Sequence, residues 1–194
     1  PQVQESAYGI VVQSRKKDIQ ISINSALHSP HEKLLLLAHV RGKMICAQWL
    51  LSDKGDIITI AKDQYPSGIV QCLLLDKNYN VLSERLGFIP YRKAIMCKVR
   101  NDKDSYGKRE LIHTNLSLVD VNGNPVKGNL SVAITDKSMA VADTTHSILS
   151  TLLLSSELKG RIETPSFYLQ TDNPEAEKAL DLLLMIHGWK RYRL

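Results

Sequence analysis

Short apolar runs separated by turn residues fill the first 90 residues, and this pattern constrains the fold more than any other feature of the chain. Residues 19–23 alternate strictly, so Ile19, Ile21 and Ile23 fall on one face, as in a half-buried strand. Gly, Pro, Asn and Asp separate the runs at a spacing of roughly 8–12 residues, which is typical of a β-sandwich. The expected strands span residues 9–12, 19–23, 34–40, 44–51, 57–60, 69–75 and 81–89.

The second half of the chain begins with the same strand pattern. A short link at residues 90–93 precedes it, and Asn122-Gly123-Asn124-Pro125 is a strong hairpin-turn signal because Asn and Gly tolerate positive φ. We therefore expect a second sandwich to open after residue 90. Its expected strands span residues 94–99, 109–119 and 130–134.

Two helix patterns follow. Asp143 is a candidate cap for a helix over about residues 144–158, which Gly160 ends. Asn173 followed by Pro174 is the start signal of a helix over residues 174–187. This second helix has a broad apolar face, which must pack on a sheet of its own domain or on a further domain.

These patterns predict a mainly β chain of two consecutive immunoglobulin-like antiparallel β-sandwiches. The first is expected over residues 1–90 and the second over residues 91–194, with the two helical segments near its C-terminus.

Charge and hydropathy exclude several classes of function. The chain has 25 Lys and Arg against 20 Asp and Glu, a net charge of +5 that is too weak and scattered to favour nucleic acid. The purest apolar run, residues 34–38, is far shorter than the roughly 20 residues of a membrane-spanning helix. Because the chain begins at Pro1 without Met, we interpret it as a piece of a longer protein.

Three cysteines, Cys46, Cys72 and Cys97, form no Cys-x-x-Cys pair. An odd number without such a pair argues against a disulfide framework and against a zinc site. Cys46 and Cys72 lie in apolar strand patterns, where free cysteine is commonly a small buried apolar residue. If the chain is exported, a disulfide bond between Cys46 and Cys72 is an alternative that the sequence does not exclude.

Several motifs of the second half resemble a macroglobulin-like domain. They are DSYGKRE at 104–110, LSLVD at 116–120, NGNPV at 122–126 and LSVAITD at 130–136. This β-sandwich is repeated in α2-macroglobulins, complement proteins and their bacterial relatives. Residues 68–89 resemble the last hairpin of a preceding domain of the same type.

The C-terminal part resembles a narrower group of proteins. Residues 148–160 and 179–192 are similar to segments of large cell-envelope proteins of Bacteroides-type bacteria. In that family macroglobulin-like domains often precede a TonB-dependent receptor plug and outer-membrane barrel. The resemblance implies an extracytoplasmic, periplasmic or outer-membrane-associated module that is structural and protein-binding, not an enzyme. Its implied partners are other domains of the same longer chain and envelope proteins.

An alternative within the same resemblance is a fragment of an α2-macroglobulin-like defence protein that traps proteases. Such traps use a Cys-Gly-Glu-Gln thioester, and no cysteine of this chain is followed by Gly. On this hypothesis the thioester lies elsewhere in the parent protein.

One motif indicates a hydrolase. Ser156 and Lys159 match the Ser-x-x-Lys nucleophile motif of penicillin-binding enzymes. That motif requires Ser-Asp-Asn and Lys-Thr-Gly elements, which the sequence lacks, so we interpret Ser156 and Lys159 as a solvated helix end. We predict no catalytic residue.

The histidines and the basic C-terminus are weaker candidates. His28 and His31 have metal-ligand spacing beside Glu32, but no further ligands with suitable spacing follow. We predict no metal site and no cofactor. His39 and His113 are expected on strands, and His187 near the end of a helix, where a partly charged imidazole suits the helix dipole. The basic, aromatic residues 190–193 are interpreted as a solvated helix exit.

Overall fold

The computed structural model describes residues 8–25, 31–91, 95–136, 138–141 and 143–188. It divides the chain into two compact units. The first, here the two-sheet unit, comprises Pro1–Tyr91 and Asp143–Leu194. The second, here the hairpin unit, comprises Arg92–Ala142. The hairpin unit is therefore an insertion in the sequence of the two-sheet unit.

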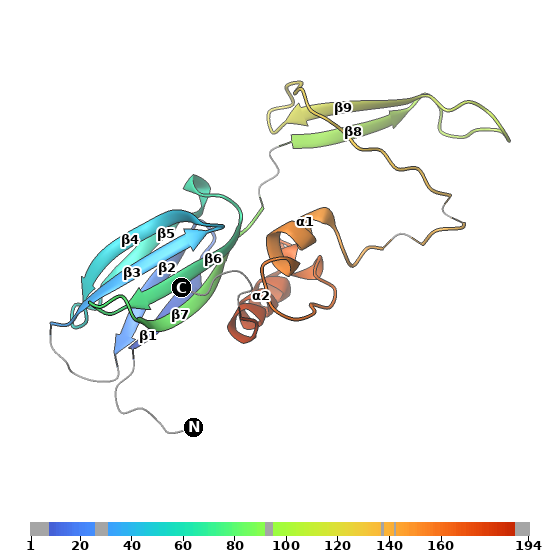
Figure 1. Cartoon of the computed structure of the whole chain (residues 1–194). Coiled ribbons are helices and arrows are strands. Elements are labelled where there is room, and N and C mark those ends of the chain that lie inside the picture. Colours follow the sequence, from blue (N-terminus) through green and yellow to red (C-terminus); the bar gives the residue numbers. More distant parts are fainter. Residues whose placement is uncertain (1–7, 26–30, 92–94, 137, 142, 189–194) are drawn as a thin grey trace. The chain divides into compact units, whose positions relative to one another are not determined.

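Two antiparallel sheets build the two-sheet unit (Figure 1). The first has the order β1-β2-β5, from Tyr8–Ser14, Asp18–Ser25 and Ile57–Ala61. The second has the order β4-β3-β6-β7, from Lys43–Leu51, Lys33–Val40, Gly68–Leu75 and Val81–Ile89. A short helix, η1 (Lys62–Gln64), follows β5. These seven strands confirm the strand pattern predicted for the first half of the chain.

One apolar core lies between the two sheets, and it explains the alternation of the sequence. Ile19 and Ile21 of β2 are almost completely buried, as are Leu34 and Leu36 of β3. Burying a side chain of this size stabilises the fold by about 1.5–3 kcal/mol. The other members of this core come from both sheets: Ile10, Val12, Ala38, Val40, Ile45, Leu50, Ile60, Val70, Cys72, Leu74 and Ile89.

Strand β6 departs from alternation, since all eight of its residues are buried. A continuous apolar run is what a strand needs when both faces of its sheet are covered. Its inner face contributes Val70 and Leu74 to the core between the sheets, and Ile69 belongs to a second core. The second core explains why the outer face of β6 is also apolar.

Helical residues that follow the hairpin unit supply that second core. They form α1 (Ile148–Ser150), which continues as the π-turn η2 (Thr151–Ser155), then η3 (Phe167–Leu169) and α2 (Pro174–Ile186). Their buried leucines pack on Ile69, Leu86 and Phe88 of β6 and β7. The helical members of this core are Leu153, Leu154, Leu180, Leu183 and Leu184, and Leu158 and Ile162 join it from the segment between η2 and η3.

This packing differs from the predicted division of the chain at residue 90. The predicted second domain includes both helical segments, whereas the structure groups residues 143–194 with the first two sheets. The physical reason is the apolar outer face of β6 and β7, which needs a cover that the helices provide. Helical spacing reveals that a helix has an apolar face but not which sheet it covers.

The helix ends show why these segments are helical. Asn173 caps α2, because its side chain accepts hydrogen bonds from the backbone of Glu175 at 3.0 Å and Ala176 at 3.4 Å. Such a cap stabilises a helix by about 1 kcal/mol. The first helical segment is capped by Ser147 in a reciprocal pair with Ser150, and not by Asp143 as the sequence predicted. Asp143 instead binds the backbone of Thr145 at 2.8 Å.

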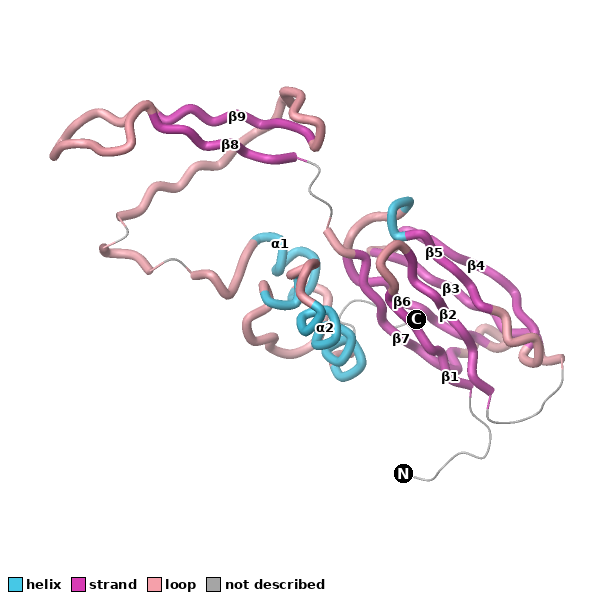
Figure 2. The backbone as a smooth tube through the Cα atoms, turned by 180° about the vertical axis from the view of Figure 1, so that it is seen from behind, coloured by secondary structure: helices cyan, strands magenta, loops and turns pink. Residues whose placement is uncertain are grey.

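The hairpin unit contains one two-stranded antiparallel sheet, formed by β8 (Ile95–Asn101) and β9 (Thr114–Asp120). The predicted third strand at residues 130–134 is wrong for this structure, because these residues have no regular structure and are exposed. Figure 2 shows the chain after β9 as a loop. Alternating apolar residues favour a strand, but a strand forms only where a neighbouring strand hydrogen-bonds to its backbone N–H and C=O groups.

Candidate functional site

Part of the outer face of the β4-β3-β6-β7 sheet carries apolar side chains that lie outside the helix-covered core. Leu35, Leu73 and Leu75 form a separate buried cluster there, with Leu37 packed against it. The strand register places Trp49 opposite Leu35, Leu35 opposite Leu75, and Leu75 opposite Val81. One row of apolar side chains therefore crosses all four strands. We call this surface the Trp49 patch: Leu35, Leu37, Trp49, Leu73, Leu75, Tyr79 and Val81.

The two aromatic rings of the Trp49 patch are its most exposed members and contact each other edge to face. Trp49 is 49% exposed and Tyr79 is 66% exposed. Their ring centroids lie 6.3 Å apart at an interplanar angle of 64°. Exposed tryptophan and tyrosine beside an apolar surface are typical of protein interfaces, where such residues contribute much of the binding energy.

The backbone at Tyr79 is unusual. Its φ angle is 64°, in the left-handed region that favours glycine and that costs other residues about 1–2 kcal/mol. The turn is held by Asp76, whose carboxylate accepts backbone hydrogen bonds from Asn78 at 2.7 Å and Asn80 at 2.9 Å. Hydrogen bonds from Asn80 hold the pKa of Asp76 below its usual value. An exposed ring at such a backbone position favours the hypothesis that Tyr79 has a functional role.

A cleft of about 540 Å³ is the second candidate, and it lies in the two-sheet unit between the strands and α2. Its walls are partly apolar, with Val12, Phe88 and Leu180 among the lining residues. Lys62 of η1 and Glu177 of α2 also line it. The cleft therefore combines apolar walls with a cation and an anion from different elements.

Lys62 is the most buried charged residue of the cleft, at 6% exposure. Its ammonium donates hydrogen bonds to the Ser14 hydroxyl at 2.8 Å and to the Arg15 carbonyl. Burial lowers the pKa of Lys62, while the charges of Glu177 and Asp18 raise it in part. These bonds hold η1 against the turn after β1, so the Lys62 ammonium has a structural role. Lys62 is not among the residues predicted from the sequence, because no local signal joins residues 14 and 62.

The Ser-x-x-Lys motif of Ser156 and Lys159 lies directly after the first helical segment. Ser156 follows the π-turn and its hydroxyl donates to the Leu152 carbonyl at 3.3 Å. Lys159 is exposed, and its backbone carbonyl contacts His187 Nδ1 at 2.6 Å. The structure thus places both residues at a helix end, where they help to terminate it. His187 stands at the end of α2, as its sequence position suggested.

Of the two histidines with metal-ligand spacing, the structure describes only His31. His28 lies outside the described residues, and His31 contacts the Asp53 carboxylate at 2.9 Å. Glu32 accepts a hydrogen bond from the Tyr8 hydroxyl at 2.5 Å, and this bond raises the pKa of Tyr8. Across the part of the chain that the structure describes, no three His, Cys, Asp or Glu side chains are grouped as metal ligands.

The other predicted positions are scattered. His39 lies on β3, whereas His113 precedes β9 in a loop instead of occupying a strand. The basic residues 190–193 lie outside the described residues. Among the helices of the described ranges, none is long and apolar enough to cross a membrane.

The three cysteines are free. Cys46 and Cys72 both lie opposite Ala38, on either side of the intervening strand β3. Two strand spacings separate their backbones by about 10 Å, which is too far for a disulfide bond. The bridge that the sequence left open is therefore excluded in this fold. Burial raises the pKa of Cys72 to about 12, and Cys97 is exposed on β8.

No family model matches the chain, and no curated protein matches it.

Proposed function

We propose that this chain is a non-catalytic protein-interaction module of a larger cell-envelope protein, and that it binds a protein partner through the Trp49 patch. The occupant is a folded protein surface with its own apolar side chains, because an apolar sheet face bearing two aromatic rings favours such a partner.

One observation carries this proposal: Tyr79 presents an exposed ring beside Trp49 from a left-handed backbone position. Glycine would relieve the backbone strain there, and a polar residue would suit the solvent. Neither would contribute a ring to the patch. Binding of a partner gives a physical reason for Tyr at this position.

The location and domain family in the proposal rest on the resemblance of the sequence motifs. On that basis the two-sheet unit is one macroglobulin-like, immunoglobulin-like domain, and the hairpin unit carries strands of a second. It is extracytoplasmic and belongs to a protein associated with TonB-dependent transport at the outer membrane. The antiparallel sheets of the two-sheet unit are consistent with such domains.

The binding surface is tested in native cells with variants of the full-length parent protein. A photo-cross-linking amino acid at Ala47, an exposed position opposite Leu37 on the same face as Trp49, reports any protein within reach. We expect a covalent product with a second protein, and its loss in Trp49→Ala and in Tyr79→Asn. Met185→Ala, which truncates an exposed apolar residue on α2, is the matched control and should retain the product.

Two outcomes would overturn parts of the proposal. Cross-links only within the parent protein, or equal yields in all three variants, would exclude partner binding at the Trp49 patch. Recovery of the parent protein in the cytoplasmic fraction of the same cells would exclude the envelope location.

A further inference from the structure

A turn with a distinctive set of hydrogen bonds connects β6 to β7. Its sequence is Asp-x-Asn-x-Asn, at residues 76–80. One carboxylate oxygen of Asp76 accepts the backbone amides of Asn78 at 2.7 Å and Asn80 at 2.9 Å. The other oxygen accepts the side-chain amide of Asn80 at 2.9 Å. These bonds fix where the chain leaves β6 and enters β7.

The same turn recurs after β9, at residues 120–124. Asp120 accepts the backbone amides of Asn122 at 2.8 Å and Asn124 at 2.9 Å, and the Asn124 side chain at 3.1 Å. The fourth residue has positive φ in both turns: 64° at Tyr79 and 85° at Gly123. The hairpin unit thus repeats, bond for bond, the turn that joins two paired strands in the two-sheet unit.

The chain also leaves both turns in the same way. Leu75 pairs with Val81 across the first turn, and Val119 pairs with Pro125 at the equivalent positions of the second. The Val126 amide then donates to the Leu118 carbonyl at 2.9 Å. After the first turn pairing continues along the whole of β7, whereas after the second the described residues add no further rung.

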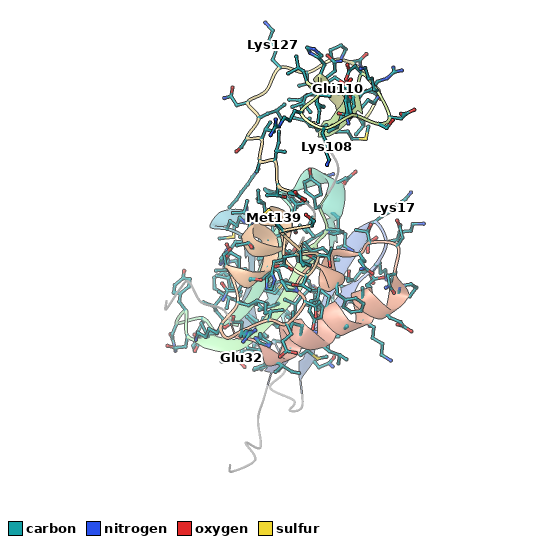
Figure 3. All side chains as sticks on the ribbon, turned by 90° about the vertical axis from the view of Figure 1, so that its right-hand side faces the viewer. Lys17, Glu32, Lys108, Glu110, Lys127 and Met139 are labelled. Carbon is teal, nitrogen blue, oxygen red and sulfur yellow. The ribbon has the colours of Figure 1, made fainter. Side chains whose placement is uncertain are left out.

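The residues beyond this point have the composition of a strand but lie in solvent. Leu130, Val132 and Ile134 alternate along the segment and are 48%, 61% and 92% exposed. Figure 3 shows the Lys127 side chain directed away from the ribbon at the start of this stretch. By position after the turn, Leu130 and Val132 correspond to two buried residues of β7, Leu86 and Phe88.

The hairpin unit also offers an acceptor for such a strand. Its sheet has the order β8-β9, so among the described residues the other edge of β9 is open beyond the Val119–Pro125 bridge. An unpaired edge presents free backbone donors and acceptors to any chain of suitable pattern. The nearest such chain is the one that the repeated turn already directs back along β9.

We propose that the open edge of β9 is a strand-binding site whose occupant is the chain's own segment 126–134. The segment closes on β9 in the register that β7 has on β6. Gln71 pairs with Leu86 in that register, so Leu130 lies opposite Asn115 in the closed state. The structure shows the open state, in which only the first rung is formed. This inference concerns the hairpin unit and is independent of the Trp49 patch.

Cysteine pairs in the full chain test the register, in a background that carries Cys97→Ser and retains half-buried Cys46 and buried Cys72. Residues directly opposite on paired strands have Cβ atoms about 4.5–5.5 Å apart, within reach of a disulfide bond. We expect Asn115→Cys/Leu130→Cys to oxidise within the monomer at least about tenfold faster than Asn115→Cys/Ser131→Cys, whose side chains fall on opposite faces. A loose segment would oxidise both pairs equally.

Hydrogen exchange on the unmodified chain gives a second measurement that needs no variant. We expect amides in residues 128–134 to exchange more slowly than their random-coil rates, with protection at alternate positions. Equal oxidation rates together with unprotected amides would overturn the proposal. Disulfide-linked dimers as the main product would also overturn it, because the occupant would then be a second copy.

Discussion

Asp181 of α2 and Arg85 of β7 form an ion pair at 2.7 Å, although 96 residues separate them in the sequence. The guanidinium also donates to the Leu86 carbonyl at 2.8 Å, which fixes its orientation. The Arg85 side chain is 14% exposed and that of Asp181 is 47% exposed. The pair therefore links the helical segment to the sheet at the border of their shared apolar core.

We predict that Asp181→Asn lowers the free energy of unfolding of the two-sheet unit by about 1 kcal/mol, since the pair is partly screened by solvent. Urea denaturation measures the change. Glu163→Gln removes an exposed carboxylate from the loop between η2 and η3 and should leave stability within about 0.5 kcal/mol of the parent. Equal effects of the two substitutions would mean that the ion pair contributes nothing.

A second prediction follows from the position of the hairpin unit in the chain. Replacing residues 92–142 with a flexible Gly/Ser linker of about 12 residues should leave the two-sheet unit folded and cooperative. A fragment of residues 1–91 should be markedly less stable, because Ile69, Leu86 and Phe88 lose their helical cover. Circular dichroism with thermal unfolding compares the two. A stable 1–91 fragment would show that the helices are dispensable.

The strands of the first half could be predicted because the evidence for them is local. Alternation in residues 19–23 and the turn at residues 53–56 require no knowledge of distant partners. The second helix was predicted over residues 174–187 and observed as Pro174–Ile186 for the same reason: its cap and its Pro are local signals.

Contacts between distant segments could not be predicted in this way. The apolar sequence of β6 indicates that both faces of its sheet are covered, but it does not indicate which segment covers the outer face. The helices that cover it were therefore predicted in the other domain. The Trp49 patch was missed because Trp49 and Tyr79 meet only through the register of four strands. Residues 130–134 were predicted as a strand because their apolar residues alternate, but in this structure they pair with no neighbouring strand.

Neighbouring leucines of the π-turn provide a third prediction. Leu154 is completely buried in the core beneath the helices, whereas Leu152 is 53% exposed. Leu154→Ala should lower the free energy of unfolding by about 3 kcal/mol, the cost of a cavity in a packed core. Leu152→Ala should change it by less than about 0.5 kcal/mol. If hydrogen exchange in β6 accelerates only in Leu154→Ala, the helices and the sheet unfold as one unit.

The buried thiol of Cys72 makes stability dependent on alkaline pH. Burial raises its pKa from the ordinary value of 9.0 to about 12 in the folded state. The unfolded chain therefore loses the thiol proton first as the pH rises, so the stabilising effect is complete below pH 9 and is lost progressively toward pH 12. This loss amounts to at most about 4 kcal/mol.

Cys72→Ala isolates this contribution. It should cost about 1 kcal/mol at pH 7, because a small cavity replaces the sulfur, and the variant should lose less stability than the parent between pH 9 and pH 11. Cys97→Ser, at an exposed position, is the control and should keep the parental pH dependence. Denaturation curves at each pH give the comparison. Parallel curves for all three proteins would show that the Cys72 thiol ionises equally well in the folded and unfolded chain.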